Sequence, residues 1–553
     1  MSFRTEGLEG VKHLGPERGC LTFERVVEAA RLVDDSGALE IVLEQKAKVA
    51  AGRGPGGRPA WVSDRAILTL LLLLALENES MHVSLAAYMV TNRLRPDSLR
   101  YLDLDTRNVT DEQVYFRLVR AFQRVVNPCD PFPGPRRKRL TGAQYQELQD
   151  SRDPEETAET NTVLHKLCNA LVMASVRRMT PESAEQFTGN VAIDGTFVKS
   201  NGRRGTDKVG LKYIAAEYDG GRHFREGNHS ENGPGSKTVN GWGFELTTVS
   251  MVRSDTAKAA THSLLFVGVA LDAPAGQPGQ NGVRALTALN ESGLPKKYLL
   301  GDRVYFAGAD TENFHEAVFD FGYMPVTDYK KTQLGTQTQF KGAIQVEGWW
   351  YCPCMPQGLI DATVDYRAAK GKISDEDYHA TIAARVKYAA VRKSRPDKDG
   401  TSRWSHPTGL GHRCNPKRKH ADQFCTQKTI SIPRHAGLKL AQELQYKSPE
   451  WRDMYARRNT IESGNAKLKR STTHGLGDPE RRRLRGRSAQ FILASLVVVA
   501  ANIQTIRSFA MSVKNRLKAE VKRKNRRRMP FGFGTMNDDE RQEIEAERSE
   551  ARE

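Results

Sequence analysis

The sequence lacks the features of a secreted or membrane-spanning protein. It has only seven cysteines. Their number is odd and their spacing is uneven, which argues against a disulfide framework and favours a reducing compartment. The longest apolar runs, Ile67 to Leu76 and Phe491 to Ala501, are too short to cross a bilayer as helices. Residues 1–10 are polar and carry Glu6 and Glu9, unlike a secretory signal. We therefore expect a cytoplasmic protein with no membrane partner.

Acidic residues are in deficit. The chain has 84 lysines and arginines against 66 aspartates and glutamates, which gives a formal charge of +18 and a pI near 9.5. An excess of this size indicates a polyanionic partner, because neutralising phosphates releases their counterions and drives binding without regard to sequence. Composition alone does not distinguish DNA from RNA or from an anionic membrane surface.

The first part of the chain predicts a helical domain. After a helix-capping pair at Ser63-Asp64, residues 66–76 are apolar on every side, which is typical of a helix buried in the middle of a helical domain. A second helix, Asp111 to Val126, follows the cap Thr110 and carries Arg117, Arg120 and Arg124 on one side. This arginine stripe fits a DNA-binding surface, and it fits the solvated side of an amphipathic helix equally well.

The most informative stretch runs from Trp451 to Arg470. It has no proline and one glycine, and it follows Ser448-Pro449-Glu450, which is typical of a helix start. If the helix is continuous, four residues fall within an arc of roughly 60° on one face, namely Tyr455, Arg458, Glu462 and Lys469. A carboxylate among cations fits a solvated face with ion pairs, and it also fits a metal-binding acid with phosphate-binding neighbours.

The spacing Tyr-x2-Arg-x3-Glu-x6-Lys resembles the signature of a large group of bacterial insertion-sequence DDE transposases. The resemblance covers roughly residues 190–510. It implies a cut-and-paste transposase in which Glu462 is the third catalytic acid, and it requires two aspartates at strand ends upstream.

Two aspartates have the required setting. Residues 190–193 are followed by Asp194 and predict a buried strand that carries an acid, while residues 298–301 predict a strand that ends on Asp302. Taken alone, Asp194 before Gly195 also fits a turn. The predicted order is a strand with an acid, two strands, a helix, a strand ending in an acid, a helix and a strand. This order matches a ribonuclease H-like core as the family has it.

The resemblance therefore implies an α/β fold, with a ribonuclease H-like mixed sheet and flanking helices. It implies an inserted domain between the second Asp and the Glu, and a helical N-terminal domain that binds the DNA ends. The expected segments are the N-terminal domain (residues 1–127), a linker with a connecting helix (128–185), the first part of the core (186–334), the inserted domain (335–432), the second part of the core (433–510) and a basic then acidic tail (511–553).

The resemblance also implies the chemistry. Asp194, Asp302 and Glu462 would hold two Mg²⁺ (or Mn²⁺) ions about 4 Å apart, because these ions prefer oxygen ligands and can act on both sides of a scissile phosphate. Arg458 and Lys469 would bind phosphates beside the cut, and Tyr455 would contact a terminal phosphate or nucleotide. The partners would be double-stranded DNA, as element ends and target, and a second copy of the chain in the DNA complex, which would make the protein nucleoid-associated.

The resemblance implies a more specific role for one of two tryptophans. In this group strand transfer usually proceeds through a hairpin with a base flipped against an aromatic side chain, for which Trp242 and Trp349 are candidates.

Cysteines and histidines gather in the inserted segment. Cys352, Cys354, His412, Cys414 and Cys425 offer the thiolates and imidazole that suit tetrahedral Zn²⁺, and His406 lies nearby in the sequence. Their spacing is not that of a standard zinc finger, so reduced, buried thiols explain the same residues.

Two other functions share part of this pattern. A different ribonuclease H-like nuclease, of the resolvase type, would need the three acids but not the Tyr, Arg and Lys beside Glu462. A catalytically silent DNA-binding derivative, acting as a repressor, would need none of the acids, and their presence argues against it.

Overall fold

The computed structural model describes residues 19–51, 60–136, 139–202, 213–223, 241–254, 260–274, 276–306, 308–394, 396–407, 414 and 422–528, with side chains up to 520. The chain divides into two compact units, Met1–Ile503 and Gln504–Glu553. The first unit is a mixed α/β structure, with a curled mixed sheet, two small sheets and many helices. The prediction of an α/β fold is confirmed at this level.

Short helices make up the N-terminal region, namely α2 (Phe23–Asp34), α3 (Ala38–Ala50), α4 (Asp64–Leu76), α5 (Val83–Tyr88), η2 (Met89–Arg93), α6 (Pro96–Tyr101) and α7 (Asp111–Val126). The Ser63 hydroxyl caps α4 by accepting a hydrogen bond from the Ala66 amide at 3.0 Å. Thr110 caps α7 in a reciprocal pair with Gln113. Every residue of α4 from Ala66 to Ala75 is buried, as its apolar sequence predicts.

The arginine stripe on α7 is largely used inside the protein. The Arg117 guanidinium lies 4.7 Å from the centre of the Trp61 ring. Arg124 donates a hydrogen bond to the Val62 carbonyl and lies 3.9 Å from the Asp64 carboxylate. Arg120 is exposed. Two of the three arginines therefore hold the segment that leads into α4, and the stripe is not a continuous free surface.

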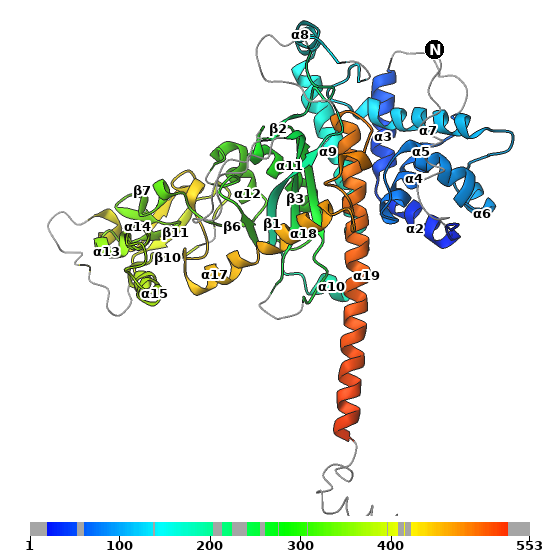
Figure 1. The fold of residues 1–553 in the computed structure, drawn as a ribbon. Coiled ribbons are helices and arrows are strands. Elements are labelled where there is room, and N and C mark those ends of the chain that lie inside the picture. The colour runs from blue at the N-terminus through cyan, green and yellow to red at the C-terminus, as the bar shows by residue number, and fades with distance from the viewer. Residues whose placement is uncertain are drawn as a thin grey trace, which may run out of the picture. The chain divides into compact units, whose positions relative to one another are not determined.

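A mixed sheet lies at the centre of the first unit (Figure 1). Its strands are β1 (Val191–Lys199), β2 (Gly221–His223), β3 (Gly241–Met251), β4 (Phe266–Asp272), β5 (Tyr298–Gly301) and β6 (Met324–Thr327). The order is β2-β3-β1-β5-β6, and β4 also pairs with β3. The pairs β1–β3, β2–β3 and β3–β4 are antiparallel, whereas β1–β5 and β5–β6 are parallel.

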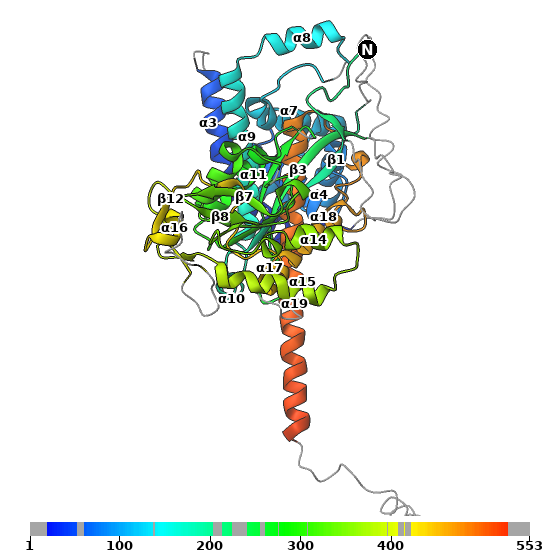
Figure 2. The same cartoon turned by 90° about the vertical axis from the view of Figure 1, so that its left-hand side faces the viewer.

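Helices α9 (Pro154–Val176), α11 (Pro278–Glu291) and α12 (Glu316–Asp320) pack on this sheet, and η4 (Thr311–His315) packs against α11. The first part of α19 (Arg487–Arg528) bonds to β4. Figure 2 shows α3 alongside α9. α9 and α19 run parallel, because Asn161 bonds to Arg487 and Ser175 bonds to Asn502 further along both helices. Helices α8 (Gly142–Asp150) and α10 (Pro181–Glu185) flank α9 in the sequence.

Two asparagine side chains bind the backbone of β4. Asn169 on α9 donates to the Val269 carbonyl and accepts from the Val269 amide, both at 2.8 Å. Asn502 on α19 makes the same pair of bonds with Phe266, also at 2.8 Å. These side chains supply partners to a strand whose backbone groups would otherwise be left unpaired in the core.

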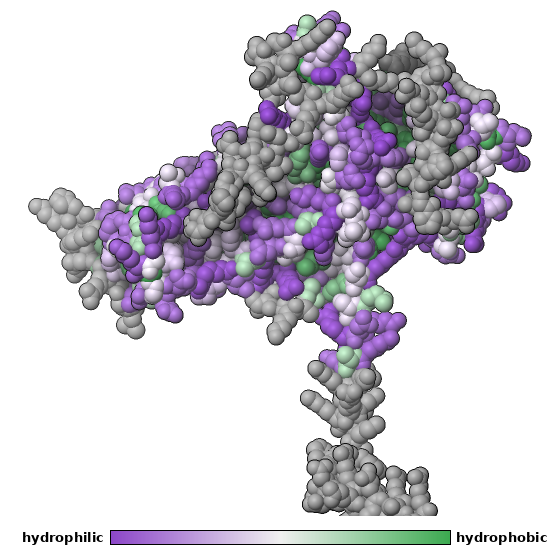
Figure 3. Space-filling view, viewed as in Figure 1, coloured by the Kyte–Doolittle hydropathy of each residue, from purple (hydrophilic) through white to green (hydrophobic). Residues whose placement is uncertain are grey.

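The helical region and the sheet share one hydrophobic core. It extends from Leu21 in the N-terminal region through α9 and β4 to Ile503 on α19. Among the described residues, α19 is the one helix long and apolar enough to cross a membrane, but 83% of its apolar window is buried inside the protein. Packing against this core accounts for its apolar sequence. On the face in Figure 3, hydrophilic residues cover most of the described surface.

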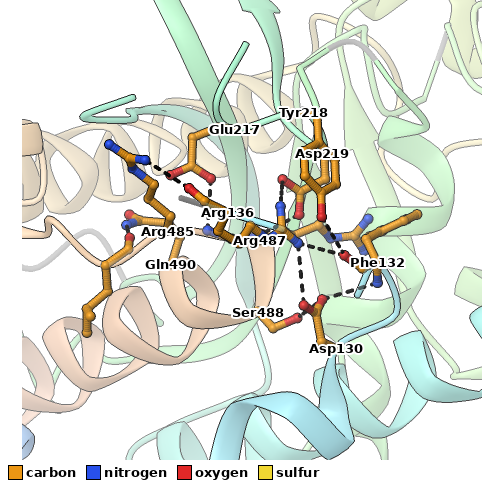
Figure 4. A network of polar contacts seen from close by, with 12 residues as sticks. Asp130, Phe132, Arg136, Glu217, Tyr218, Asp219, Arg485, Arg487, Ser488 and Gln490 are labelled. Atoms are coloured by element: carbon orange, nitrogen blue, oxygen red, sulfur yellow. Dashed lines mark hydrogen bonds and ion pairs between the residues drawn. The ribbon is translucent and has the colours of Figure 1, made fainter. Parts of the chain in front are cut away.

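A polar network fastens the start of α19 to the segment before α8 and to residues 217–219 (Figure 4). Arg136 bonds to the Asp219 carboxylate at 2.7 Å, and the other Asp219 oxygen accepts from the Arg487 amide at 2.9 Å. Glu217 accepts from the Gly486 amide at 2.8 Å. Burial raises the pKa of Glu217 to about 7, and the charge of Asp219 adds to this rise.

The inserted segment has a hydrophobic core of its own. One small sheet contains β7 (Thr336–Phe340), β8 (Ala343–Val346) and β9 (Trp349–Tyr351), and the other contains β10 (Val391–Arg392), β11 (Ser402–Ser405) and β12 (Ile430–Ile432). Figure 1 shows this segment and the N-terminal helices on opposite sides of the large sheet. Its helices are α13 (Gln357–Ile360), α14 (Ala362–Ala368), α15 (Asp375–Ala384) and α16 (Gln423–Thr426).

The stretch predicted as one helix from Trp451 forms two, α17 (Pro449–Ala456) and α18 (Asn459–Lys469). Ser448 caps α17 as predicted. Between the helices, the amides of Arg457 and Arg458 bond to carbonyls three residues back, to Met454 and Tyr455. This tighter turn interrupts the α-helical pattern, so the prediction of a continuous helix is wrong.

Candidate active site and metal-binding cluster

Asp194 and Asp302 lie on neighbouring parallel strands. Asp194 is in the middle of β1, which excludes the turn interpretation, and Asp302 directly follows β5. The register pairs Ile193 with Gly301, and the residue that follows each of them is an aspartate. Adjacent strands are about 4.8 Å apart, and equivalent residues of a parallel pair point to the same face of the sheet. The fold therefore places the two aspartates at adjacent positions of neighbouring strands.

Glu462 comes from the helix that packs on this part of the sheet. α18 contacts β1 and β3, and Asn465 on α18 donates a hydrogen bond to Asp194 Oδ2 at 3.0 Å. Glu462 is one helical turn before Asn465 and shares its face. The Glu462 side chain is 48% exposed, so this acid lies at the open side of the group.

Arg458 interacts with all three acids. Its guanidinium forms an ion pair with Glu462 at 2.8 Å. Burial lowers the pKa of Arg458, but the Tyr455 phenol and the three carboxylates outweigh burial, so its pKa is raised overall. One guanidinium therefore pairs with Glu462 and interacts electrostatically with the carboxylates from β1 and the end of β5.

The Asp194 carboxylate is subject to opposing influences. Burial raises the pKa of Asp194, and the nearby Glu462 carboxylate adds to the rise. The hydrogen bond from Asn465 and the charge of Arg458 lower it but do not cancel the effect of burial. A divalent cation would stabilise the ionised carboxylates, and oxygen donors are the ligands that Mg²⁺ prefers.

The other two signature residues have different surroundings. Tyr455 stacks on Trp451 with ring centres 4.6 Å apart. The Arg458 guanidinium lies over the Tyr455 ring, 5.6 Å from its centre. Lys469 is exposed at the last position of α18, about 10 Å along the helix axis from Glu462. Tyr455 and Arg458 thus adjoin the acids, whereas Lys469 lies further along the helix.

Sequence reasoning missed several residues around the acids. Thr248 on β3 donates to Asn465 Oδ1 at 3.0 Å and so orients the amide that binds Asp194. Tyr305 is buried, and its hydroxyl lies 3.2 Å from Thr247 Oγ1. A Cβ at Gly195 would lie 2.7 Å from Glu245 Oε1, so a larger residue there would require the Glu245 side chain to move. The helical spacing of Asn465 from Glu462 was the available signal for the first of these contacts.

The two tryptophans considered for base stacking make contacts within the protein. Trp242 Nε1 donates to the Glu217 carbonyl at 2.8 Å. Trp349 Nε1 donates to the Ala390 carbonyl at 3.2 Å, and its ring packs edge-on against Trp404.

A second group of chemically reactive side chains lies in the inserted segment. The ligand atoms of Cys352, His406, Cys414 and Cys425 all lie within 4.8 Å of one another and could bind a metal ion such as zinc. Cys354, also predicted as a ligand, lies beside this group with its sulfur 3.3 Å from that of Cys414. His412, the predicted imidazole ligand, lies outside the described residues.

Comparison of the chain with protein-family models, curated proteins and solved structures gives no match.

Proposed function

We propose that this protein is a DDE transposase that cleaves the DNA ends of its own insertion sequence and transfers them to a target. The observation that carries the proposal is the meeting of Asp194, Asp302 and Glu462 around Arg458, in a chain whose Tyr455, Arg458, Glu462 and Lys469 match the family signature. Gathering like charges costs free energy, so the convergence of three acids that are far apart in the sequence supports a functional role.

The order of the strands supports a ribonuclease H-like core. A strand with an acid is followed by the short strand β2, two longer antiparallel strands, a helix, a parallel strand that ends in an acid, a helix and a further parallel strand. The inserted segment comes between the second aspartate and the glutamate, as the resemblance implies. The helix with Glu462 then returns to the first strand.

The three carboxylates fit one or two Mg²⁺ ions. With Arg458 they carry a net charge of about −2 when ionised, which suits a divalent cation with its retained waters. Such ions, when bound, activate an oxygen nucleophile and stabilise the leaving 3′ oxygen of DNA.

The protein's own residues would bind and orient the DNA. Glu462 holds Arg458 at 2.8 Å, so recruiting this carboxylate to a cation would release the guanidinium to bind a phosphate by two parallel hydrogen bonds. Lys469, exposed further along α18, would bind a phosphate outside the cut. Tyr455 carries its phenol beside Arg458 and would contact the terminal nucleotide.

The test is a cleavage assay on linear DNA that carries the sequences flanking the gene, including any inverted repeats. Asp194→Asn, Asp302→Asn and Glu462→Gln should each abolish Mg²⁺-dependent nicking while DNA binding persists. Glu450→Gln is the matched control, because Glu450 is an exposed acid on the neighbouring helix α17. Cleavage by the three variants at the rate of the control would refute the proposed site.

A resolvase-type nuclease is distinguished by the substrate. It would cut branched DNA irrespective of the flanking sequence, whereas a transposase requires its own ends and joins them to target DNA. Joined products in the same assay therefore separate the two enzymes.

A further inference from the structure

We propose that Cys352, His406, Cys414 and Cys425 form a structural Zn²⁺ site that joins the two small sheets of the inserted segment. The site is independent of the proposed DNA chemistry, because none of its residues belongs to the acidic group on the large sheet.

The four ligands come from separate points of the chain. Cys352 directly follows β9, the last strand of the first small sheet. His406 directly follows β11, the central strand of the other small sheet, and Cys425 lies on α16, just before β12. Cys414 lies between the last two in the sequence. A single ion would therefore tie the two sheets together.

The distances suit a tetrahedral ion. Two thiolates bound to zinc at about 2.3 Å lie about 3.8 Å apart, and a thiolate and an imidazole nitrogen lie slightly closer. The sulfurs of Cys352 and Cys425 are 3.8 Å apart, and Cys352 Sγ is 3.2 Å from His406 Nε2. All four ligand atoms fall within 4.8 Å. Random packing of thiols rarely gives four donors of this kind at such mutual distances.

The surroundings support a closed structural site. Cys352 is fully buried and Cys425 is 6% exposed, and both belong to the hydrophobic core of the inserted segment. The Cys354 amide donates a hydrogen bond to Cys352 Sγ at 3.4 Å, and this contact stabilises a thiolate. The His406 ring packs beside Phe424, which limits its rotation. Four protein ligands leave no open position for a substrate, unlike a catalytic zinc site.

Cys354 lies next to the site but does not belong to the group of four close ligand atoms. Its sulfur approaches Cys414 at 3.3 Å, much further than the bond length of about 2.0 Å in a disulfide. All four cysteines of this segment and the other three of the chain are free thiols. Cys354 therefore offers a discriminating control for the identity of the fourth ligand.

The experiment measures metal content in the purified full-length protein. We expect one zinc per chain, lost in Cys352→Ser, His406→Ala, Cys414→Ser and Cys425→Ser. The matched controls are Cys354→Ser within the segment and Cys20→Ser, an exposed cysteine elsewhere. Both should keep the metal. Loss of zinc in Cys354→Ser together with its retention in His406→Ala would overturn the ligand set.

A second measurement covers variants that fail to fold. Zinc is removed from the intact protein with a chelator and replaced by Co²⁺, whose thiolate absorption reports three sulfurs and one nitrogen. Restoration of Trp349 and Trp404 fluorescence by Zn²⁺ would support a structural role, since these rings pack against each other between the two sheets. Absence of zinc, with no Co²⁺ absorption and unchanged fluorescence, would overturn the proposal whatever the outcome of the DNA assay.

Discussion

Asn465 donates a hydrogen bond to Asp194 at 3.0 Å and thereby ties α18 to the middle of β1. The two residues are far apart in the sequence. The side-chain amide of Asn465 is itself oriented by a hydrogen bond from Thr248 on β3. Because Glu462 is one turn earlier on α18, this bond also sets where the third acid stands relative to the first. Asn465 is thus a positioning residue for the acidic group.

Replacing Asn465 should weaken the proposed cleavage without removing it. We expect Asn465→Ala to lower the activity about 10- to 100-fold, because groups that orient metal ligands typically contribute this much. The Mg²⁺ concentration needed for half-maximal cleavage should rise, which a general loss of stability would not cause. Asn459→Ala, at an exposed asparagine that begins α18, is the control. An unchanged Mg²⁺ requirement in Asn465→Ala would contradict the positioning role.

Lys469 should contribute to DNA affinity through charge alone. Lys469→Ala is expected to weaken binding of the element ends and to reduce the slope of log K against log salt by about 1, because one fewer phosphate is neutralised. The slope is measured by titrating DNA binding at several salt concentrations. Lys467→Ala, at an exposed lysine two residues earlier on α18, is the comparison. A slope that stays the same in Lys469→Ala would exclude a phosphate contact.

His165 should make the protein less stable in mild acid. Burial holds its pKa at about 3, with the charge of Arg487 as a further cause, whereas an unfolded histidine has a pKa near 6.5. Between these two pKa values the histidine is protonated in the unfolded chain but neutral in the folded chain. The free energy of unfolding is therefore highest above about pH 6.5 and falls as the pH decreases toward 3. The expected loss between pH 7 and pH 5 is about 2 kcal/mol.

The His165 contribution can be isolated by substitution. His165→Asn retains a donor toward the Asn161 carbonyl, which His165 Nδ1 contacts at 2.8 Å, and removes the titrating group. Urea unfolding at pH 7 and pH 5 should show a smaller loss for this variant than for the parent. His435→Asn, at an exposed histidine, should behave as the parent does. Equal losses in parent and His165→Asn would contradict the assignment.

The inserted segment contains a buried ion pair that should be costly to break from one side. Arg385 and Glu347 are 2.5 Å apart and almost fully buried, with side chains 2% and 0% exposed. Arg385→Met leaves the Glu347 carboxylate buried without its positively charged partner, and should lower the free energy of unfolding of this segment by about 3–5 kcal/mol.

The matching double substitution tests the cause. Glu347→Gln combined with Arg385→Met removes both charges and should cost clearly less than Arg385→Met alone, because no unpaired charge remains. Chemical denaturation followed by tryptophan fluorescence reports the difference. A double variant that is as unstable as the single one would attribute the loss to packing.

Much of the local structure could be predicted from the sequence. The caps Ser63 and Thr110 begin helices α4 and α7 as predicted, because a hydroxyl followed by an apolar helical pattern satisfies the first amides locally. The strands around Asp194 and before Asp302 were recognisable from short apolar runs. The prediction of one helix through Arg458 was wrong, since helical composition does not reveal the tight turn that packing imposes at residues 457–458.

The larger organisation was less accessible. The sequence predicts a helical N-terminal domain and an α/β core, and the structure adds that the two share one hydrophobic core through α9 and α19. The arginine stripe on α7 left two alternatives open, and contacts with Trp61 and Val62 occupy two of its members. Such contacts join residues tens of positions apart and leave no periodic signal in the sequence.

The sequence by itself determined which side chains could carry the chemistry: the acids at 194, 302 and 462, the cations of the signature and the thiols of the inserted segment. It did so because apolar runs, caps and residue spacing act over a few neighbouring residues. Only the tertiary structure decided that all three acids interact electrostatically with Arg458, that Asn465 binds Asp194, and that His406 joins three cysteines. Those relationships depend on how strands pair and helices pack across hundreds of residues, which local patterns do not encode.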